Sequence, residues 1–267
     1  MKNKDVLVLV SDMNYIQHAK ALFSNVKNVA NWKGSYALIG KNLTKETVKE
    51  FESKSIEVLN IESNNSSFFI KFNVFDTYFK RWDNVYYLDI DIQIYKPFQI
   101  YIEKNEFYCD FERWSIREYF SMWLQDTEVY NETKNKLFTE LDVNYSEIIN
   151  NKGFNTGAMF FSTSLINHDT LYDLHLLMNK YKEINKHTGL ELGTDQPIIN
   201  LMFRQYAKQF PNNEISYWTS NKYQSSGSHF CRWSVPWNNN SIAPQINKPY
   251  NKFYNENLFK FNETQFS

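Results

Sequence analysis

Apolar runs alternate with helical patterns over the first ninety residues of the chain. The run Val6 to Val10 contains only Val and Leu, which is typical of a strand buried on both faces. Further strands are expected at residues 35–39, 56–61 and 84–89, and helices at 15–26, 44–53 and 68–79. Thr44 has the residue type of an N-cap for the second of these helices. The alternation predicts an α/β fold with a mostly parallel central sheet flanked by helices, in which ligands bind at the carboxyl ends of the strands.

The pattern changes after about residue 110. Between residues 111 and 150 aromatic and charged residues mix and helical periodicity is only partial, which predicts a helical insertion over the site. A strand is expected again at 158–162, and helices at 171–182 and 195–206. From Ser225 onward, prolines and polar residues predict loops. Since no repeat or linker is visible, we expect one domain over 1–267. It would comprise an N-terminal half (about 1–100), a second half (about 101–237) and a tail (238–267).

Composition excludes some classes of partner. The formal net charge is −1, and nucleic-acid binding usually requires a basic excess or a clustered basic face. Cys109 and Cys231 are too few for a disulfide framework in a chain of 267 residues, which favours a reducing compartment. The start of the chain lacks the features of a secretory signal, and no stretch approaches the roughly 18 apolar residues of a membrane-spanning helix. We therefore expect a cytoplasmic protein without a transmembrane segment.

Asp89 and Asp91 form the strongest local signal. They follow an apolar strand directly, and side chains two residues apart on an extended backbone point the same way. Carboxylate oxygens suit Mg²⁺ or Mn²⁺, and such an ion can bridge a diphosphate. A second interpretation stays open at this point, because two Asp residues also commonly end a strand in a turn.

A metal-dependent phosphatase is a competing class of enzyme with a paired-Asp motif. In that class the pair usually opens the chain, and Thr or Val stands two residues after the second Asp. Here the pair lies mid-chain and Gln93 fills that position. The sequence therefore disfavours a phosphatase.

Four further segments occur in a definite order along the chain. They are Asp12 to Tyr15, Asn155-Thr-Gly157, Asp195-Gln196 and His229 to Trp237. Together with Tyr-Leu-Asp-Ile-Asp, they resemble the landmarks of the family-eight retaining glycosyltransferases. That group includes glycogenin and the lipopolysaccharide galactosyltransferases, and it has the GT-A fold. The resemblance spans nearly the whole chain except residues 111–150 and the tail after Trp237. It implies transfer of a hexose from a UDP-sugar, with retention, to a glycan, protein or lipid acceptor. It also implies that the half at about 1–100 binds the nucleotide and that the half at about 101–237 binds the acceptor.

The resemblance also implies how the donor is held. Asp12 would hydrogen-bond the edge of the nucleobase, usually uracil, and Tyr15 would stack on it. Lys71 would touch the donor from the helix before the acidic strand. Considered by residue type alone, Tyr15 could equally pack inward, and a lone Lys on a helix is usually solvated.

By the same resemblance, Asp89, Asp91 and His229 would bind the metal. Two carboxylates with one imidazole favour Mn²⁺ over Mg²⁺. The metal would act as a Lewis acid on the departing diphosphate. A lone His is more often a structural residue, so the assignment of His229 depends on the Phe230 and Pro236-Trp237 that follow it.

Asn155, Asp195 and Gln196 are the expected catalytic residues. The resemblance implies that they line the donor sugar and the acceptor side, with Gln196 close to the reacting carbon. They would position the sugar and stabilise charge without forming a covalent intermediate. Asp195 could also serve as the N-cap of the helix that follows it.

The closing motif departs from the family pattern, which reads His-Phe-x-Gly-x-x-Lys-Pro-Trp. Arg232 stands in place of the Gly and Val235 in place of the Lys that contacts the diphosphate. Arg232 could replace the lost cation, because a guanidinium binds phosphate well. A catalytically weak or inactive sugar-nucleotide-binding homologue therefore stays open as an alternative.

Trp114, Trp123 and Trp233 could serve as sugar platforms or as core residues.

Overall fold

A central seven-stranded sheet organises the molecule. The computed structural model describes residues 4–64, 67–98, 100–115, 151–188, 195–211, 215–217, 226–230 and 244–266. The strands are β1 (Asp5–Asp12), β2 (Ser35–Lys41), β3 (Ile56–Ile61), β4 (Asn84–Leu88), β6 (Phe107–Ser115), β7 (Lys152–Ser162) and β8 (Ala207–Gln209), in the order β3-β2-β1-β4-β7-β6-β8. Strand β7 is antiparallel to both its neighbours, and the other four pairs are parallel. The expected α/β fold with a mostly parallel sheet is confirmed.

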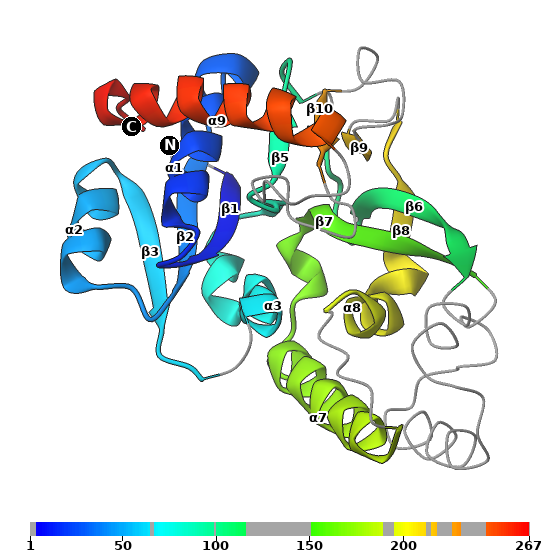
Figure 1. The fold of residues 1–267 in the computed structure, drawn as a ribbon. Helices are drawn as coiled ribbons and strands as arrows, with labels where there is room; N and C mark the ends of the chain where they lie inside the picture. The colour runs from blue at the N-terminus through cyan, green and yellow to red at the C-terminus, as the bar shows by residue number, and fades with distance from the viewer. Residues whose placement is uncertain are drawn as a thin grey trace.

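Helices cover both faces of this sheet, as Figure 1 shows. They are α1 (Ile16–Asn25), α2 (Lys45–Ser53), α3 (Ser67–Ile70), α7 (Thr170–Thr188), α8 (Gln196–Phe203) and α9 (Pro244–Glu263). The side chain of Thr44 accepts a hydrogen bond from the backbone N–H of Thr47 at 3.2 Å, which confirms it as the N-cap of α2. No helix in the described part of the chain is long and apolar enough to cross a membrane.

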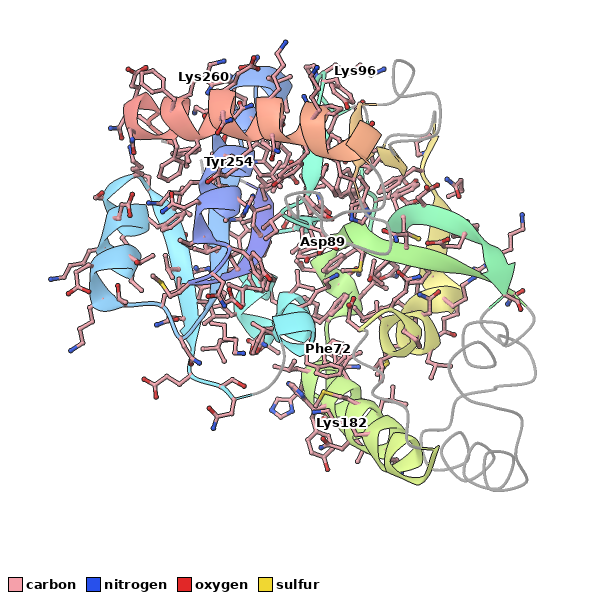
Figure 2. All side chains as sticks on the ribbon, viewed as in Figure 1. Phe72, Asp89, Lys96, Lys182, Tyr254 and Lys260 are labelled. Atoms are coloured by element: carbon pink, nitrogen blue, oxygen red, sulfur yellow. The ribbon has the colours of Figure 1, made fainter. Side chains whose placement is uncertain are left out.

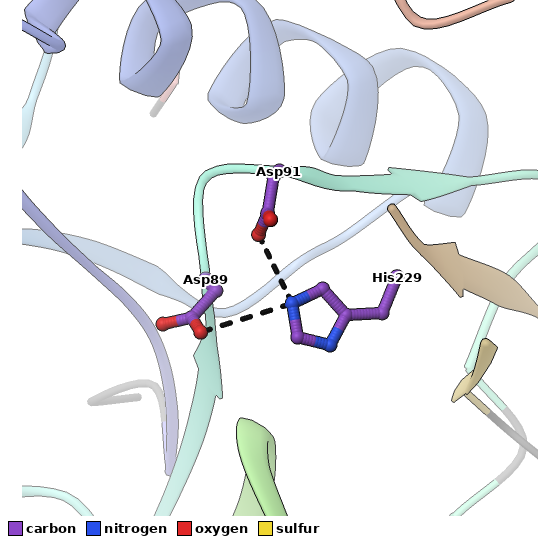
Figure 3. Close-up of side chains that lie close together, drawn as sticks. All are labelled: Asp89, Asp91 and His229. Atoms are coloured by element: carbon purple, nitrogen blue, oxygen red, sulfur yellow. Dashed lines mark hydrogen bonds and ion pairs between the residues drawn. The ribbon is translucent and has the colours of Figure 1, made fainter. Parts of the chain in front are cut away.

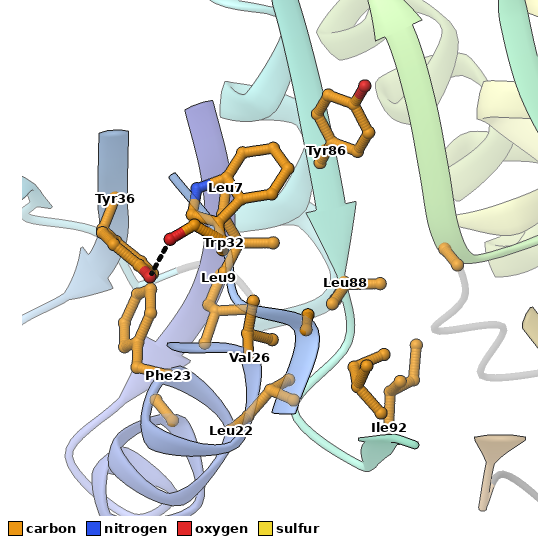
Figure 4. Packing of buried hydrophobic residues seen from close by; sticks show 14 of the residues in the cluster. Leu7, Leu9, Leu22, Phe23, Val26, Trp32, Tyr36, Tyr86, Leu88 and Ile92 are labelled. Atoms are coloured by element: carbon orange, nitrogen blue, oxygen red, sulfur yellow. Dashed lines mark hydrogen bonds between the residues drawn. The ribbon is translucent and has the colours of Figure 1, made fainter. Parts of the chain in front are cut away.

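The two faces carry separate apolar cores, because successive residues of a strand point to opposite faces. Val6 and Val8 of β1 belong to a core with α3, α7 and α8. Leu7 and Leu9 of the same strand belong to the other core, with α1, α2 and α9. Figure 4 shows part of this second core, where Phe23 of α1 lies near Leu9. Burial on both sides explains why β1 has a continuous apolar sequence.

A second sheet of three short strands lies beside the first. It consists of β5 (Ile92–Ile94), β10 (Gly227–His229) and β9 (Ile215–Tyr217), in the order β5-β10-β9. Antiparallel pairing places His229 of β10 opposite Ile92 of β5. This pairing links the segment after the acidic motif to the segment that carries the histidine.

The helix expected at 68–79 is wrong as a continuous element. Helix α3 ends at Ile70, and two 3₁₀ segments follow, η2 (Lys71–Phe75) and η3 (Thr77–Arg81). Asp76 separates them in an extended conformation, and its carboxylate accepts a hydrogen bond from the backbone N–H of Tyr78 at 2.7 Å. An Asp that caps a new turn competes with continuation of the preceding helix.

The expected loop-rich tail is also wrong over α9. Helix α9 covers twenty residues and packs along α1. Tyr250, Phe253, Asn257 and Phe261 are buried at helical spacing, so one face of this polar segment is aromatic. Pro249 lies within its second turn.

Several other expectations differ in their bounds or lie outside the description. The strand expected at 158–162 is the end of the eleven-residue β7, and the helix expected at 195–206 ends at Phe203 before a 3₁₀ turn (η5, Arg204–Tyr206). Residues 111–115, expected to open the insertion, belong to strand β6. Residues 116–150, with Trp123, and also Trp233 lie outside the described residues. The division of the domain into halves near residue 100 stays a prediction.

Candidate metal and donor site

Asp89, Asp91 and His229 lie together at the end of β4, as Figure 3 shows. The chain leaves β4 at Leu88 and enters β5 at Ile92, so both carboxylates sit on the short connection between two strands. The imidazole Nε2 lies 3.1 Å from Oδ1 of Asp91 and 3.8 Å from Oδ2 of Asp89. One ligand atom from each residue falls within 4.8 Å of the others, so the three could hold a single metal ion.

Backbone hydrogen bonds fix this arrangement. The N–H of Asp89 donates to the carbonyl of Gly157 in β7 at 2.6 Å, and the N–H of Phe230 donates to the carbonyl of Asp91 at 3.0 Å. The first bond ties the acidic connection to the large sheet, and the second ties it to β10. The ligand set is therefore held by rigid elements from both sheets, which is what a preorganised site requires.

Lys71 lies inside the same cluster. Its ammonium lies 3.0 Å from Oδ1 of Asp89 and 3.1 Å from Oδ2 of Asp195, and the whole residue is only 6% exposed. Figure 2 shows Asp89 near the middle of the molecule. The sequence placed Lys71 against the donor, and the structure places it between two carboxylates.

This cluster carries more negative than positive charge, which favours the binding of a cation. Among the described residues, this cluster contains three carboxylates (Asp89, Asp91 and Asp195) and one ammonium, that of Lys71, which contacts Asp89 and Asp195. Buried or partly buried carboxylates that lack a counter-ion are costly. A divalent ion bound by Asp89, Asp91 and His229 would supply the missing positive charge, and their oxygen and nitrogen donors suit Mn²⁺.

The two carboxylates of the motif differ in their pKa values. Burial raises the pKa of Asp89, and repulsion from Asp91 adds to this effect, against the attraction of Lys71. Burial alone would also raise the pKa of Asp91, but the adjacent His229 outweighs it and lowers that pKa. The protein thus stabilises the negative charge of Asp89 less than that of Asp91. A bound metal ion would therefore stabilise the charged form of Asp89 more.

Asn155 and Gln196 adjoin the metal-binding cluster. The amide oxygen of Asn155 lies 3.1 Å from Nδ1 of His229, and its NH₂ group lies 3.4 Å from Oε1 of Gln196. Gln196 is the first residue of α8, and its Oε1 also accepts from the backbone N–H of Thr156 at 3.4 Å. Both residues expected to be catalytic therefore lie within one hydrogen-bonded unit with the histidine.

Asp195 does not act as a side-chain cap. It precedes α8 with a helical backbone conformation and makes no capping hydrogen bond. Its Oδ2 instead accepts from Thr156 Oγ1 at 2.6 Å and contacts Lys71. Asp195 therefore occupies the N-cap position of α8, but its carboxylate is turned to the buried cluster and does not cap the helix.

Asp12 and Tyr15 lie at the carboxyl end of β1, the strand next to β4. The two strands are parallel, with Val8 opposite Tyr87, so both ends face the same edge of the sheet. Asp12 Oδ1 accepts from the backbone N–H of Asn14 at 2.9 Å, and Tyr15 is half-buried beside His18, with ring centroids 6.3 Å apart. Arg232 and Val235 lie outside the described residues.

Three residues of this site were missed by sequence reasoning. The hydroxyl of Tyr87 donates to Asp89, Thr156 donates to Asp195, and Glu112 Oε1 accepts from the NH₂ of Asn155 at 3.3 Å. Tyr87 belongs to an apolar strand and so gave a core signal, and Glu112 falls where an insertion was expected. Thr156 was part of the Asn-Thr-Gly motif, which could have pointed to it.

Comparison of the whole fold gives a consistent class of solved structures. The galactosyltransferase LgtC is similar: the structure of an active-site mutant of it has a TM-score of 0.63 at 13% identity, over 94% of this chain and 95% of that one. The glycosyltransferase GlyE of Streptococcus pneumoniae TIGR4 has a TM-score of 0.58 at 14% identity, over 97% of this chain and 63% of that one. The bifunctional glycosyltransferase WbbM has a TM-score of 0.62 at 14% identity, over 100% of this chain and 52% of that one.

The chain thus has the fold of the GT-A glycosyltransferases. No family sequence model matches the chain, and no curated protein matches it significantly by sequence. The expected fold is confirmed, and Asp89, Asp91 and His229 lie where they could share a metal ion.

Proposed function

We propose that this chain is a metal-dependent glycosyltransferase of the family-eight type, which transfers a hexose from a UDP-sugar to a glycan, protein or lipid acceptor with retention. The observation that carries the proposal is the convergence of Asp89, Asp91 and His229 at the carboxyl end of β4 in a GT-A fold. Their separation along the sequence makes this convergence a product of the fold. A coincidental acidic turn has no reason to include a buried histidine.

The donor would lie along the edge shared by β1 and β4. Asp12 and Tyr15 would hold uracil at the end of β1, and the diphosphate would approach the metal ligands at the end of β4. Mn²⁺ bound there would stabilise the negative charge that develops on the departing UDP. Arg232 is proposed to supply further positive charge to the diphosphate in place of the lysine that Val235 replaces.

The sugar would lie against Asn155, Asp195 and Gln196. Lys71 and Thr156 both hold Oδ2 of Asp195, which fixes the carboxylate in place. A fixed carboxylate in a charged cluster suits electrostatic stabilisation of a cationic sugar in the transition state. Gln196 would orient the sugar through its side-chain amide. In this mechanism the acceptor oxygen bonds to the anomeric carbon on the face that UDP leaves, as the bond from that carbon to UDP breaks. The proton of the acceptor hydroxyl passes to the departing diphosphate, and no protein atom becomes bonded to the sugar.

The test combines ligand stabilisation with turnover. A thermal-shift screen of nucleotide sugars with Mn²⁺ should show stabilisation by one UDP-sugar, which depends on the metal. Asp91→Asn should lose that stabilisation together with donor hydrolysis and transfer. Asp83→Asn is the matched control, because this carboxylate is 66% exposed and its nearest ion-pair partner, Lys4, lies at 3.9 Å. Stabilisation by none of the donors would contradict the proposal.

The substitution at Val235 motivates the second candidate, a sugar-nucleotide-binding homologue without transferase activity. It predicts metal-dependent binding of the donor with neither hydrolysis nor transfer. Release of phosphate from simple esters without any response to UDP would indicate the phosphatase instead.

A further inference from the structure

Asn155 forms a hydrogen bond with His229 on the side of the ring away from Asp89 and Asp91. The imidazole Nδ1, on the side of the ring away from the carboxylates, lies 3.1 Å from the amide oxygen of Asn155. Both residues are buried, at 5% and 9% exposure. Nε2, the predicted ligand atom, belongs to the same ring as Nδ1. A hydrogen bond to Nδ1 therefore affects both the orientation of the ring and which of its nitrogens carries a hydrogen.

The orientation of the Asn155 amide is fixed by Gly157. The backbone N–H of Gly157, which can only donate, lies 2.8 Å from Oδ1 of Asn155. A flipped amide would place NH₂ against this donor, so the oxygen must face both Gly157 and His229. An oxygen that accepts from His229 requires a hydrogen on Nδ1.

The proton on Nδ1 decides what Nε2 offers. With a metal ion bound, only Nδ1 of the neutral imidazole would carry a hydrogen, so Nε2 would present its lone pair to the ion beside Asp91 and Asp89. This is the form that coordinates a metal ion. With a hydrogen on Nε2 instead, His229 would donate to Asp91 at 3.1 Å and would be blocked as a ligand.

Gly157 contributes space as well as a hydrogen bond. A Cβ atom at this position would lie 2.1 Å from Cε1 and 2.6 Å from Nδ1 of His229, and 2.8 Å from Oδ1 of Asn155. Real Cβ atoms do not approach ring atoms so closely, so any larger residue would displace the imidazole or the amide. Gly157 therefore lets the ring reach the carboxylates.

We propose that Asn155 and Gly157 are positioning residues that set the ring orientation and the Nδ1–H form of His229 for metal binding. This inference rests on the proposed function and adds a second task for Asn155 beside contact with the sugar. The two ends of its amide divide the tasks. The oxygen is committed to Gly157 and His229, and the NH₂ group faces Gln196 and Glu112 on the sugar side.

The first experiment measures Mn²⁺ binding to the full chain without any donor. Asn155→Leu keeps the side-chain volume but removes the acceptor for Nδ1–H. We expect Mn²⁺ affinity, titrated by electron paramagnetic resonance, to fall about 10- to 100-fold, as for other residues that orient a metal ligand. At saturating Mn²⁺, the spin-echo modulation that a coordinated imidazole nitrogen produces should weaken or disappear.

Three further variants separate positioning from a general loss of structure. Asn155→Asp keeps an oxygen acceptor towards both N–H groups, and it should retain the nitrogen modulation although it loses the NH₂ contacts on the sugar side. Gly157→Ala should weaken that signal while Asn155 is intact. Asn257→Leu removes a buried amide from α9, where it donates to Phe253 at 2.9 Å, and should bind Mn²⁺ like the wild type.

The outcomes distinguish this inference from the proposed function. If wild-type protein binds Mn²⁺ without nitrogen modulation, or does not bind it, the metal site itself is wrong. If wild type shows the signal and folded Asn155→Leu retains both the signal and an affinity within twofold, the positioning role is wrong and the metal site stands.

Discussion

The ammonium of Lys71 lies 3.1 Å from a carboxylate oxygen of Asp195 in the interior of the protein. Burial alone would lower the pKa of Lys71, but the carboxylates of Asp195 and Asp89 outweigh it and raise that pKa. Lys71 is therefore charged at any physiological pH and offsets part of the negative charge around the metal site.

Substitution of Lys71 should move stability and metal affinity in opposite directions. Lys71→Met removes the positive charge that pairs with the carboxylates of Asp89 and Asp195, and should cost about 3 kcal/mol of unfolding free energy in urea without metal. This value is the lower end of the usual cost of breaking a buried ion pair, because the Asp89 side chain is 26% exposed to solvent. The same variant should bind Mn²⁺ severalfold more tightly, since a competing positive charge is gone. Weaker Mn²⁺ binding in a folded Lys71→Met protein would argue against this account.

Removal of metal should destabilise the native protein. With Mn²⁺ at a hundred times its dissociation constant, the unfolding free energy should exceed that in EDTA by about 2.7 kcal/mol. His229→Leu, which removes one ligand and adds no charge, should shrink this difference strongly. Equal unfolding curves in Mn²⁺ and EDTA for the wild type would contradict a native metal site.

His18 should make the protein less stable in mild acid. Burial lowers its pKa from 6.5 to about 4, against a smaller opposing effect of Asp91. Between these values the unfolded chain binds more protons than the native protein, so stability is complete above pH 6.5 and decreases as the pH falls towards 4. Because this imidazole is partly exposed, we expect a loss of about 1–2 kcal/mol, less than the full shift would give.

The pH effect can be assigned with one variant. Unfolding in urea at pH 7 and pH 5 should differ less for His18→Gln than for the wild type. An unchanged pH dependence in that variant would place the effect on other groups.

Helix α9 should contribute strongly to stability through its aromatic face. Phe261 is fully buried, with ring centroids 5.5 Å from both Phe51 and Phe266. Phe261→Ala should cost about 3–5 kcal/mol of unfolding free energy. Phe259, on the same helix and 70% exposed, provides the control, and its replacement by Ala should change stability by less than about 0.5 kcal/mol. Equal effects of the two substitutions would mean that α9 is not docked as described.

Strands β1, β2 and β4 of the first half were predictable because they are buried on both faces, and the half-buried edge strand β3 was found from its apolar residues. A strand was expected at 56–61, and β3 spans Ile56–Ile61. The run Val6 to Val10 likewise lies inside β1. Continuous apolar sequence is a strong signal for such strands. The antiparallel placement of β7 could not be predicted in this way, because strand direction depends on the path of the chain between β4 and β7.

The site was predictable to a smaller extent. Asp89 and Asp91 are two residues apart in sequence and follow a strong strand signal, so local pattern was sufficient to find them. Their partner His229 was found only through a family resemblance, since β5 and β10 have three residues each and show no periodicity. The position of Lys71 depends on the change from α-helix to 3₁₀ helix after Ile70. Helix propensities do not predict such a change.

Helix α9 was missed for a different reason. Its sequence contains Pro249 and many Asn residues, which favour turns over helices when counted one by one. Burial of Tyr250, Phe253 and Phe261 against the rest of the molecule outweighs these local preferences. Such tertiary override is the ordinary source of error in reading helices from sequence.

The proposed metal ligands Asp91 and His229 are 138 residues apart in the chain. During synthesis at the usual rate, the acidic pair therefore precedes its imidazole partner by on the order of 10 s. A nascent chain that has reached β5 carries two of the three ligands and lacks the strand that closes the second sheet. If these residues bind the ion as proposed, its tight uptake would be a late event of biogenesis, and metal content would measure the fraction of molecules that have completed their folding.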